Sequence, residues 1–192
     1  MNILVTGRSG SGKSTFAQKL SQALGFEYID IDKVGHSLYQ DKNILEKTRQ
    51  LFGDGIFDDG VFNRKKLGKI IFSEQGSERV KQFNDLTWSY MQDIIDKKIE
   101  QHGNVVLDWI LLPTTKYWNW GERILVKADK AKRFEKIKQR DNVSEEYIEA
   151  REKAAIVYFE DEFDYVVEND FSDKLEREVA RIANIILNEV EK

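Results

Sequence analysis

The sequence predicts an α/β fold of three layers, in which helices cover both faces of a five-stranded parallel sheet. Short apolar segments, rich in β-branched and aromatic residues, alternate with longer segments of helical pattern. The first apolar segment leads into a glycine-rich loop that opens a helix. At 192 residues the chain is long enough to bury the core of such a domain without disulfides or a structural metal.

The strands are expected in chain order at Asn2–Thr6, Glu27–Asp30, Asn104–Asp108, Arg123–Ala128 and Tyr165–Glu168. Ligands of such sheets bind beyond the carboxyl ends of the strands, so functional residues are sought there. We expect one domain over residues 1–192.

The stretch of about residues 41–102 is too long for a simple crossover between the second and third strands. It is predicted to form several helices, with turns at Gly53–Gly55 and Asp58–Gly60 and a long helix from about Ser77. We interpret it as a helical insertion that forms a ligand-binding lobe. A last helix, from about Ser172, has apolar residues at helical spacing and is expected to be structural.

The strongest functional signal is the phosphate-binding loop pattern over Gly7–Ser14. Its glycines let successive main-chain amides point inward at an anion, and the helix that begins near Lys13 adds the positive end of its dipole. Lys13 is expected to reach the β- and γ-phosphates, and the Ser14 hydroxyl to ligate Mg²⁺. The alternative is a glycine-serine turn before an ordinary helix. The residues expected to bind ATP are Gly10, Ser11, Gly12, Lys13, Ser14 and Thr15.

Carboxylates end two of the predicted strands. Asp108 follows the apolar run Val105–Leu107, where an aspartate orients magnesium or its waters in many nucleotide-binding proteins, although an ordinary turn aspartate fits as well. Asp30 and Asp32 close the second strand, and one of them is a candidate to accept the proton of an attacking hydroxyl. The structural alternative for Asp32 is the N-cap of a helix over Lys33–Tyr39.

A basic helix is expected over Lys130–Arg140, inside a predicted lid of about residues 130–157. Six of its side chains are cationic, and Glu135 is its one acid. Lys136 and Arg140 share a helix face at i, i+4, which makes them the candidates for contact with the transferring phosphoryl group. The alternative is a solvated helix face.

Composition excludes several classes of function. The chain has no cysteine, which excludes disulfides, thiolate nucleophiles and cysteine-ligated metals, and its two histidines are too few to suggest a metal centre. The net charge of −4 gives no support for nucleic-acid or membrane binding. Met1 leads directly into an apolar strand, and no window is apolar enough to span a bilayer. We therefore expect a cytoplasmic protein.

In order along nearly the whole chain, the motifs resemble those of dephospho-coenzyme A kinases. Beyond the loop Gly7–Thr15, the residues that carry the resemblance are Ile29–Asp32, Phe52-Gly53, Asp59-Gly60, Arg64, Leu67, Ile71-Phe72, Val105–Asp108, Leu111-Leu112, Arg140-Asp141, Ser144–Glu146, Ala150-Arg151 and Phe163–Asn169.

The resemblance implies a P-loop kinase fold with a helical acceptor-binding insertion and a lid, acting on ATP with Mg²⁺ as cofactor. It implies transfer of the γ-phosphoryl group to the 3′-hydroxyl of dephospho-coenzyme A by a protein expected to be a monomer. Asp32 would be the base, and Lys13 and Arg140 would stabilise the phosphoryl group. Mg²⁺ would be held by Ser14 and Asp108.

The chain departs from the family pattern at several positions. Trp88-Ser89 stands where the family usually has His-Pro, and Ile110–Thr114 where it has Pro-Leu-Leu-Phe-Glu. Ala155 occupies the place of a usual glutamine, and Lys136 that of a lid arginine. A P-loop nucleoside or nucleotide kinase with another acceptor therefore stays an alternative.

Two non-enzymatic functions fit the sequence less well. A GTP-binding switch would use Asp32–Gly35 as its D-x-x-G segment, but no Asn-Lys-x-Asp segment specifies guanine anywhere in the chain. A family member that binds nucleotide without catalysis is disfavoured because Lys13, Ser14, Asp32 and Arg140 are all present.

Overall fold

The computed structural model describes residues 1–74 and 76–190. The chain divides into two compact units. The first comprises Met1–Asp30 and Gln101–Lys192, and the second comprises Ile31–Glu100. Each unit has its own hydrophobic core.

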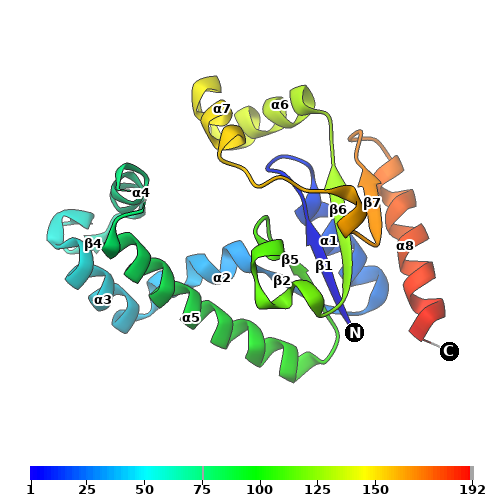
Figure 1. Cartoon of the computed structure of the whole chain (residues 1–192), viewed down its shortest axis with the longest axis horizontal. Helices are drawn as coiled ribbons and strands as arrows, with labels where there is room; N and C mark the ends of the chain where they lie inside the picture. Colours follow the sequence, from blue (N-terminus) through cyan, green and yellow to red (C-terminus); the bar gives the residue numbers. More distant parts are fainter. Residues whose placement is uncertain (75, 191–192) are drawn as a thin grey trace. The chain divides into compact units, whose positions relative to one another are not determined.

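A five-stranded parallel sheet organises the first unit (Figure 1), which confirms the predicted α/β class. Its order is β2-β5-β1-β6-β7. The strands are β1 (Asn2–Thr6), β2 (Glu27–Asp30), β5 (Val105–Asp108), β6 (Glu122–Lys127) and β7 (Tyr165–Glu168). β1 lies between β5 and β6. The connection after β1 leads to β2 at one edge of the sheet, and the connection after β6 leads to β7 at the other edge. Ligands of such sheets bind where the connections diverge in this way, so we expect them beyond the carboxyl end of β1.

Three strands have the predicted bounds, and two differ at their ends. Asn104 is not part of β5, because its N–H turns back to the carbonyl oxygen of His102 at 2.8 Å. β6 ends at Lys127, whose carbonyl oxygen accepts the N–H of Asn169 at 2.7 Å. Ala128 lies beyond that bond, where the chain turns into the next helix.

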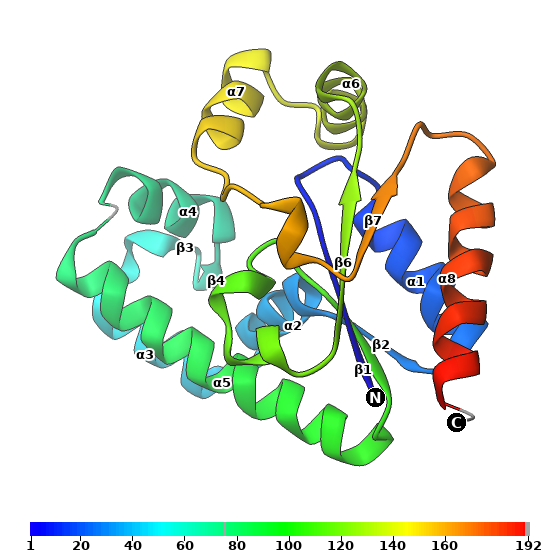
Figure 2. The same cartoon turned by 45° about the vertical axis from the view of Figure 1, so that its right-hand side comes forward.

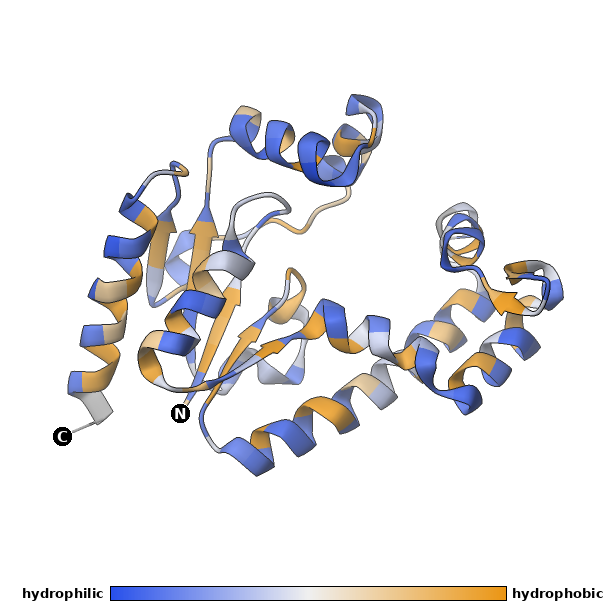
Figure 3. Cartoon of the chain, turned by 180° about the vertical axis from the view of Figure 1, so that it is seen from behind, coloured by the Kyte–Doolittle hydropathy of each residue, from blue (hydrophilic) through white to orange (hydrophobic). Residues whose placement is uncertain are grey.

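Helices α1 and α8 pack against each other and against one face of the sheet. Ile3 and Val5 of β1 belong to this core, together with Phe16 and Leu20 of α1 and Ile182 of α8. Figure 3 shows the matching pattern on α8, the helix nearest the C-terminus, with an apolar stripe along one side and hydrophilic residues along the other. The helices of this unit are α1 (Lys13–Leu24), α6 (Lys130–Asp141), α7 (Glu145–Lys153) and α8 (Lys174–Val190), with short 3-10 turns η3 (Leu112–Thr114), η4 (Lys116–Asn119) and η5 (Glu160–Glu162).

The opposite face of the sheet is covered as well. Leu4, Leu107 and Leu125 alternate with the residues of the first face, and none of them is more than 2 % exposed. Strands buried on both sides are typical of parallel sheets. In the part of the chain that the structure describes, no helix is both long and apolar enough to cross a bilayer.

The second unit is mainly helical, with a core that includes Phe52, Ile56, Leu67, Val80 and Phe83. Its elements are α2 (Ile31–Ser37), η1 (Leu38–Gln40), α3 (Lys42–Phe52), η2 (Asp54–Ile56), β3 (Phe57–Asp58), β4 (Val61–Phe62), α4 (Arg64–Ser73) and α5 (Glu78–His102), whose last two residues belong to the first unit.

A two-stranded hairpin, β3-β4, interrupts the helices that the sequence predicts for this region. Its turn is Asp59-Gly60, with φ angles of 48° and 82°. Positive φ at both positions is the geometry that aspartate-glycine favours in a two-residue hairpin turn. The predicted turn is therefore present, but it joins strands.

Asp32 is not a helix N-cap. Helix α2 begins at Ile31, directly after strand β2, so that Asp32 lies in the first helical turn. The predicted start at Lys33 was wrong because strand and helix meet without a connecting loop.

Candidate active site

The phosphate loop connects β1 to α1 and leaves the start of the helix open. Gly12 precedes α1 in a left-handed conformation, with a φ of 86° and no side-chain capping bond. No acidic side chain lies in the first turn. The first amides of a helix lack partners within the helix and carry the positive end of its dipole. This helix start is therefore suited to bind an anion, as the sequence predicts.

Two glycines of the loop are required by close packing as well as by backbone conformation. A Cβ atom at Gly10 would lie 2.7 Å from the carbonyl oxygen of Arg133 in α6. At Gly12 it would lie 2.3 Å from Nδ2 of Asn169. Since the φ angles of both glycines are also positive, any larger residue would strain the loop and displace its neighbours.

Asn169 braces the loop from the end of β7. Its side chain is buried, and Nδ2 donates to the carbonyl oxygen of Ser11 at 2.8 Å. Its Oδ1 accepts the N–H of Phe171 at 2.9 Å, which fixes the orientation of the amide. Sequence analysis placed Asn169 in a family motif but gave it no role.

Asp108 lies buried at the carboxyl end of β5, in register with Asp30 of β2. The Tyr28 hydroxyl donates to Oδ2 of Asp108 at 3.0 Å. Burial raises the pKa of Asp108, while the Lys13 ammonium, the Ser14 hydroxyl and Tyr28 oppose that rise. Burial and the charge of Asp108 raise the pKa of Tyr28, so that the phenol stays protonated and keeps donating.

The residues present fit a magnesium ion. Oδ1 of Asp108 is buried and has no hydrogen-bond partner within the described residues. The Ser14 hydroxyl, which interacts with Asp108, offers a second oxygen as a metal ligand. Mg²⁺ prefers oxygen ligands and usually takes only one or two from the protein, with water and substrate phosphates completing its shell. Among residues 1–74 and 76–190, no three or more His, Cys, Asp or Glu side chains form a cluster that could hold a metal ion.

Helices α6 and α7 lie beyond the end of the sheet to which the β6 arrow points (Figures 1 and 2). Lys136 and Arg140, the two candidates from the basic helix, line a pocket of about 440 Å³ that also includes Gly12, Thr15 and Phe171. Both predicted residues therefore share a pocket with the phosphate loop. The Arg140 guanidinium also binds the adjacent carboxylate Asp141, at 2.6 and 2.8 Å.

The buried cation of the basic helix is Arg133, which sequence analysis did not single out. Its side chain is 5 % exposed, whereas that of Arg140 is 62 % exposed. The sequence did contain a signal for its burial. Ile137 is an apolar residue on the inner face of α6, and Arg133 lies four residues before it, on the same face of the helix.

The structure thus brings Lys13, Ser14 and Asp108 together in the first unit, with Arg140 on the pocket beside the loop. Asp32, the predicted base, belongs to the second unit. It lies two residues after the end of β2, the strand in register with Asp108.

Comparisons with known proteins identify the family of this chain. The sequence profile of the dephospho-CoA kinase family matches residues 1–175. A dephospho-CoA kinase of Helicobacter pylori is 30% identical over 201 aligned positions, which cover 96% of this chain and 97% of the relative. The corresponding protein of Dehalococcoides mccartyi is 30% identical over 154 positions, covering 77% and 76%.

Solved structures show the same fold. The Thermus thermophilus protein TT1252 superposes with a TM-score of 0.81 at 26% identity, covering 98% of this chain and 97% of its own. A dephospho-CoA kinase from Campylobacter jejuni gives a TM-score of 0.59 at 24% identity, covering 96% of each chain. From the profile match and the relatives together, this chain belongs to the dephospho-CoA kinase family.

Proposed function

We propose that this chain transfers the γ-phosphoryl group of ATP to the 3′-hydroxyl of dephospho-CoA with the residues gathered at the carboxyl edge of its sheet. Members of the family are ATP-dependent kinases of coenzyme A biosynthesis, and the family match favours this acceptor over a nucleoside or nucleotide. The observation that carries the proposal is the buried Asp108 beside Lys13 and Ser14, at the open start of α1.

In this proposal the amides of the loop and the Lys13 ammonium hold the β- and γ-phosphates of ATP. The nucleoside occupies the pocket between α1, α6 and the segment after β7, where Phe171 supplies an apolar wall. Lys136 lies over that ring, 5.5 Å from its centroid, and Arg140 lines the same pocket. From there Arg140 would contact the transferring group, where an arginine contributes about 10³–10⁵ in rate in related phosphoryl transfers.

Ser14 and Oδ1 of Asp108 would hold Mg²⁺ with the phosphates of ATP. The ion would neutralise charge on the phosphate oxygens. Tyr28 holds the other carboxylate oxygen, which leaves Oδ1 directed away from that hydrogen bond.

In this proposal the phosphoryl group passes directly from ATP to the acceptor, without a covalent enzyme intermediate. The 3′-oxygen of the acceptor attacks the γ-phosphorus in line, and the bond from that phosphorus to the oxygen bridging to ADP breaks. Asp32 accepts the proton of the attacking hydroxyl. Positioning and charge stabilisation supply most of the rate enhancement.

The insertion of about residues 41–102 would bind the acceptor. We also propose that the chain is a cytoplasmic monomer that binds neither nucleic acid nor membranes.

The decisive experiment is an acceptor panel in which ADP formation is measured with dephospho-CoA, nucleosides and nucleoside monophosphates. We expect turnover with dephospho-CoA, and turnover only with the other acceptors would refute the proposal. Lys13→Ala should lower turnover about 100-fold or more. Arg177→Ala, on the exposed side of α8, removes a positive charge far from the loop in the sequence and serves as the control; its turnover should equal that of the native chain.

A further inference from the structure

A cluster of three charged side chains joins the phosphate loop to the lid. Oε1 of Glu152, in α7, accepts hydrogen bonds from Arg8 at 2.9 Å and from Arg133 at 2.7 Å, and Oε2 accepts a second bond from Arg133 at 3.0 Å. The side chains of Arg133 and Glu152 are only 5 % and 17 % exposed. Bonds between ionised partners in such surroundings are among the strong hydrogen bonds of proteins.

The cluster connects three segments that are far apart in the sequence. Arg8 is the second residue of the phosphate loop, Arg133 lies in the first turn of α6, and Glu152 lies near the end of α7. Arg133 also donates to the carbonyl oxygen of Ser9 at 3.1 Å. One guanidinium therefore binds both the backbone of the loop and the carboxylate of the lid.

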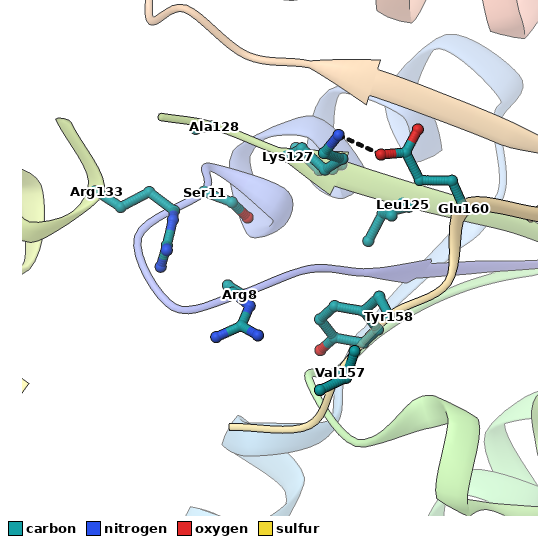
Figure 4. A pocket seen from close by; sticks show the side chains of 10 residues that line it. Arg8, Ser11, Leu125, Lys127, Ala128, Arg133, Val157, Tyr158 and Glu160 are labelled. Atoms are coloured by element: carbon teal, nitrogen blue, oxygen red, sulfur yellow. Dashed lines mark hydrogen bonds and ion pairs between the residues drawn. The ribbon is translucent and has the colours of Figure 1, made fainter. Parts of the chain in front are cut away.

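Two cations share one carboxylate here, so the carboxylate is needed to hold both. The hydrogen bonds from Arg133 keep the pKa of Glu152 below its ordinary value, with a smaller contribution from Arg8, although burial opposes the effect. Arg8 and Arg133 line a cavity of about 150 Å³. Figure 4 shows one of these side chains reaching in from the loop and the other from α6. Without Glu152 the two guanidinium groups would face each other unneutralised.

We infer that Glu152 is a positioning residue for ATP: through Arg8 and Arg133 it fixes the phosphate loop against the lid before the nucleotide binds. The inference rests on the proposed function in one respect, that this loop holds the phosphates. A loop that is already ordered loses less conformational entropy on binding, so the affinity for ATP is higher. Glu152 touches no reacting atom in this scheme. Its effect therefore belongs in the binding of ATP more than in the chemical step.

The test compares Glu152→Gln and Glu152→Ala with Glu149→Gln, a matched control on the exposed side of the same helix. Calorimetric titration with magnesium-ATP should give a Kd raised about tenfold for Glu152→Ala, and less for Glu152→Gln, because losing one partner of a buried charge cluster is costly. The control should keep the native Kd. Steady-state kinetics should show KM for ATP rising more than kcat falls.

Hydrogen exchange separates positioning from simple loss of stability. The amides of residues 7–12 should exchange faster in both Glu152 variants, while those of the central strand β1 keep their protection. If Glu152→Ala melts at a lower temperature but binds ATP with the native Kd, the inference is overturned.

A second variant keeps the test decisive if Glu152→Ala does not fold. The double substitution Arg133→Met/Glu152→Met replaces the buried pair with unbranched apolar side chains, an exchange that proteins often tolerate. Its Kd for magnesium-ATP should rise, because the link to the loop is lost, and a native Kd would refute the inference. Absence of ATP binding by the unmodified chain would instead refute the proposed ATP site, so the two failures are distinguishable.

Discussion

Replacing Gly12 with alanine tests how the fold holds the phosphate loop. Gly12 has a φ of 86°, and an added Cβ would lie 2.3 Å from Nδ2 of Asn169. That distance is far below a van der Waals contact, so Asn169 must move. When it moves, its hydrogen bond to the carbonyl oxygen of Ser11 breaks.

The expected cost has two parts. Alanine in the left-handed region costs about 1–2 kcal/mol. Loss of the Asn169–Ser11 bond leaves buried polar groups unsatisfied, which costs about 1–3 kcal/mol. Together Gly12→Ala should lower the free energy of unfolding by about 2–5 kcal/mol. Displacement of the loop should also reduce turnover about 100-fold.

Gly25→Ala provides the matched control. Gly25 ends the same helix α1, its φ of 69° is also left-handed, and an added Cβ would meet no atom within 4 Å. It should therefore show the backbone cost alone, about 1–2 kcal/mol in urea unfolding, with native turnover. The difference between the two variants isolates the contact with Asn169.

Two results would contradict this reasoning. Equal destabilisation by Gly12→Ala and Gly25→Ala would show that the contact with Asn169 costs nothing. A fully additive double variant Gly12→Ala/Asn169→Ala would show the same, since the clash and the lost bond are shared and should be counted only once.

Three further predictions concern the carboxylates. Asp32→Asn should lower turnover about 100-fold or more while calorimetry finds nearly native ATP affinity, and near-native turnover would exclude Asp32 as the base. Tyr28→Phe should raise about tenfold the Mg²⁺ concentration needed for half-maximal ATP binding, because Asp108 loses the hydroxyl that orients it; an unchanged requirement would remove Tyr28 from the site. The lowered pKa of Glu152 means that its contribution to stability is complete above its ordinary pKa and is lost as pH falls through the lower folded value. Below about pH 4, urea unfolding should show the stability gap between the native chain and Glu152→Gln closing, and a gap independent of pH would speak against the charge cluster.

Local signals in the sequence predicted the sheet well. The glycines after β1 and the apolar runs bounded by turns located β1, β2 and β7 to the residue. The helix pattern likewise predicted α1, α6 and the long α5. The β3-β4 hairpin was missed because strands of two residues carry too little alternation to be recognised, although its Asp59-Gly60 turn was noticed.

The candidate site was predictable where its residues share one local segment. Lys13 and Ser14 follow from the loop pattern, and Asp108 from the apolar strand before it. The charged side chains that hold the loop in place were not predictable, because they meet only through tertiary contacts between segments that are distant in the sequence. Glu152 lies 144 residues from Arg8, and nothing in either segment indicates that they meet.

The division of hydrophobic cores bears on how this chain can change over evolutionary time. Among the residues that the structure describes, the buried cluster that packs α1 and α8 onto the sheet draws on residues 1–30 and 101–192, and the cluster of the helical unit draws on residues 31–100. Only two peptide bonds, at Asp30–Ile31 and Glu100–Gln101, pass from one unit to the other. Because these two clusters share no residue, the side chains that pack α1 and α8 onto the sheet can stay the same while the core of the helical unit changes from one family member to another.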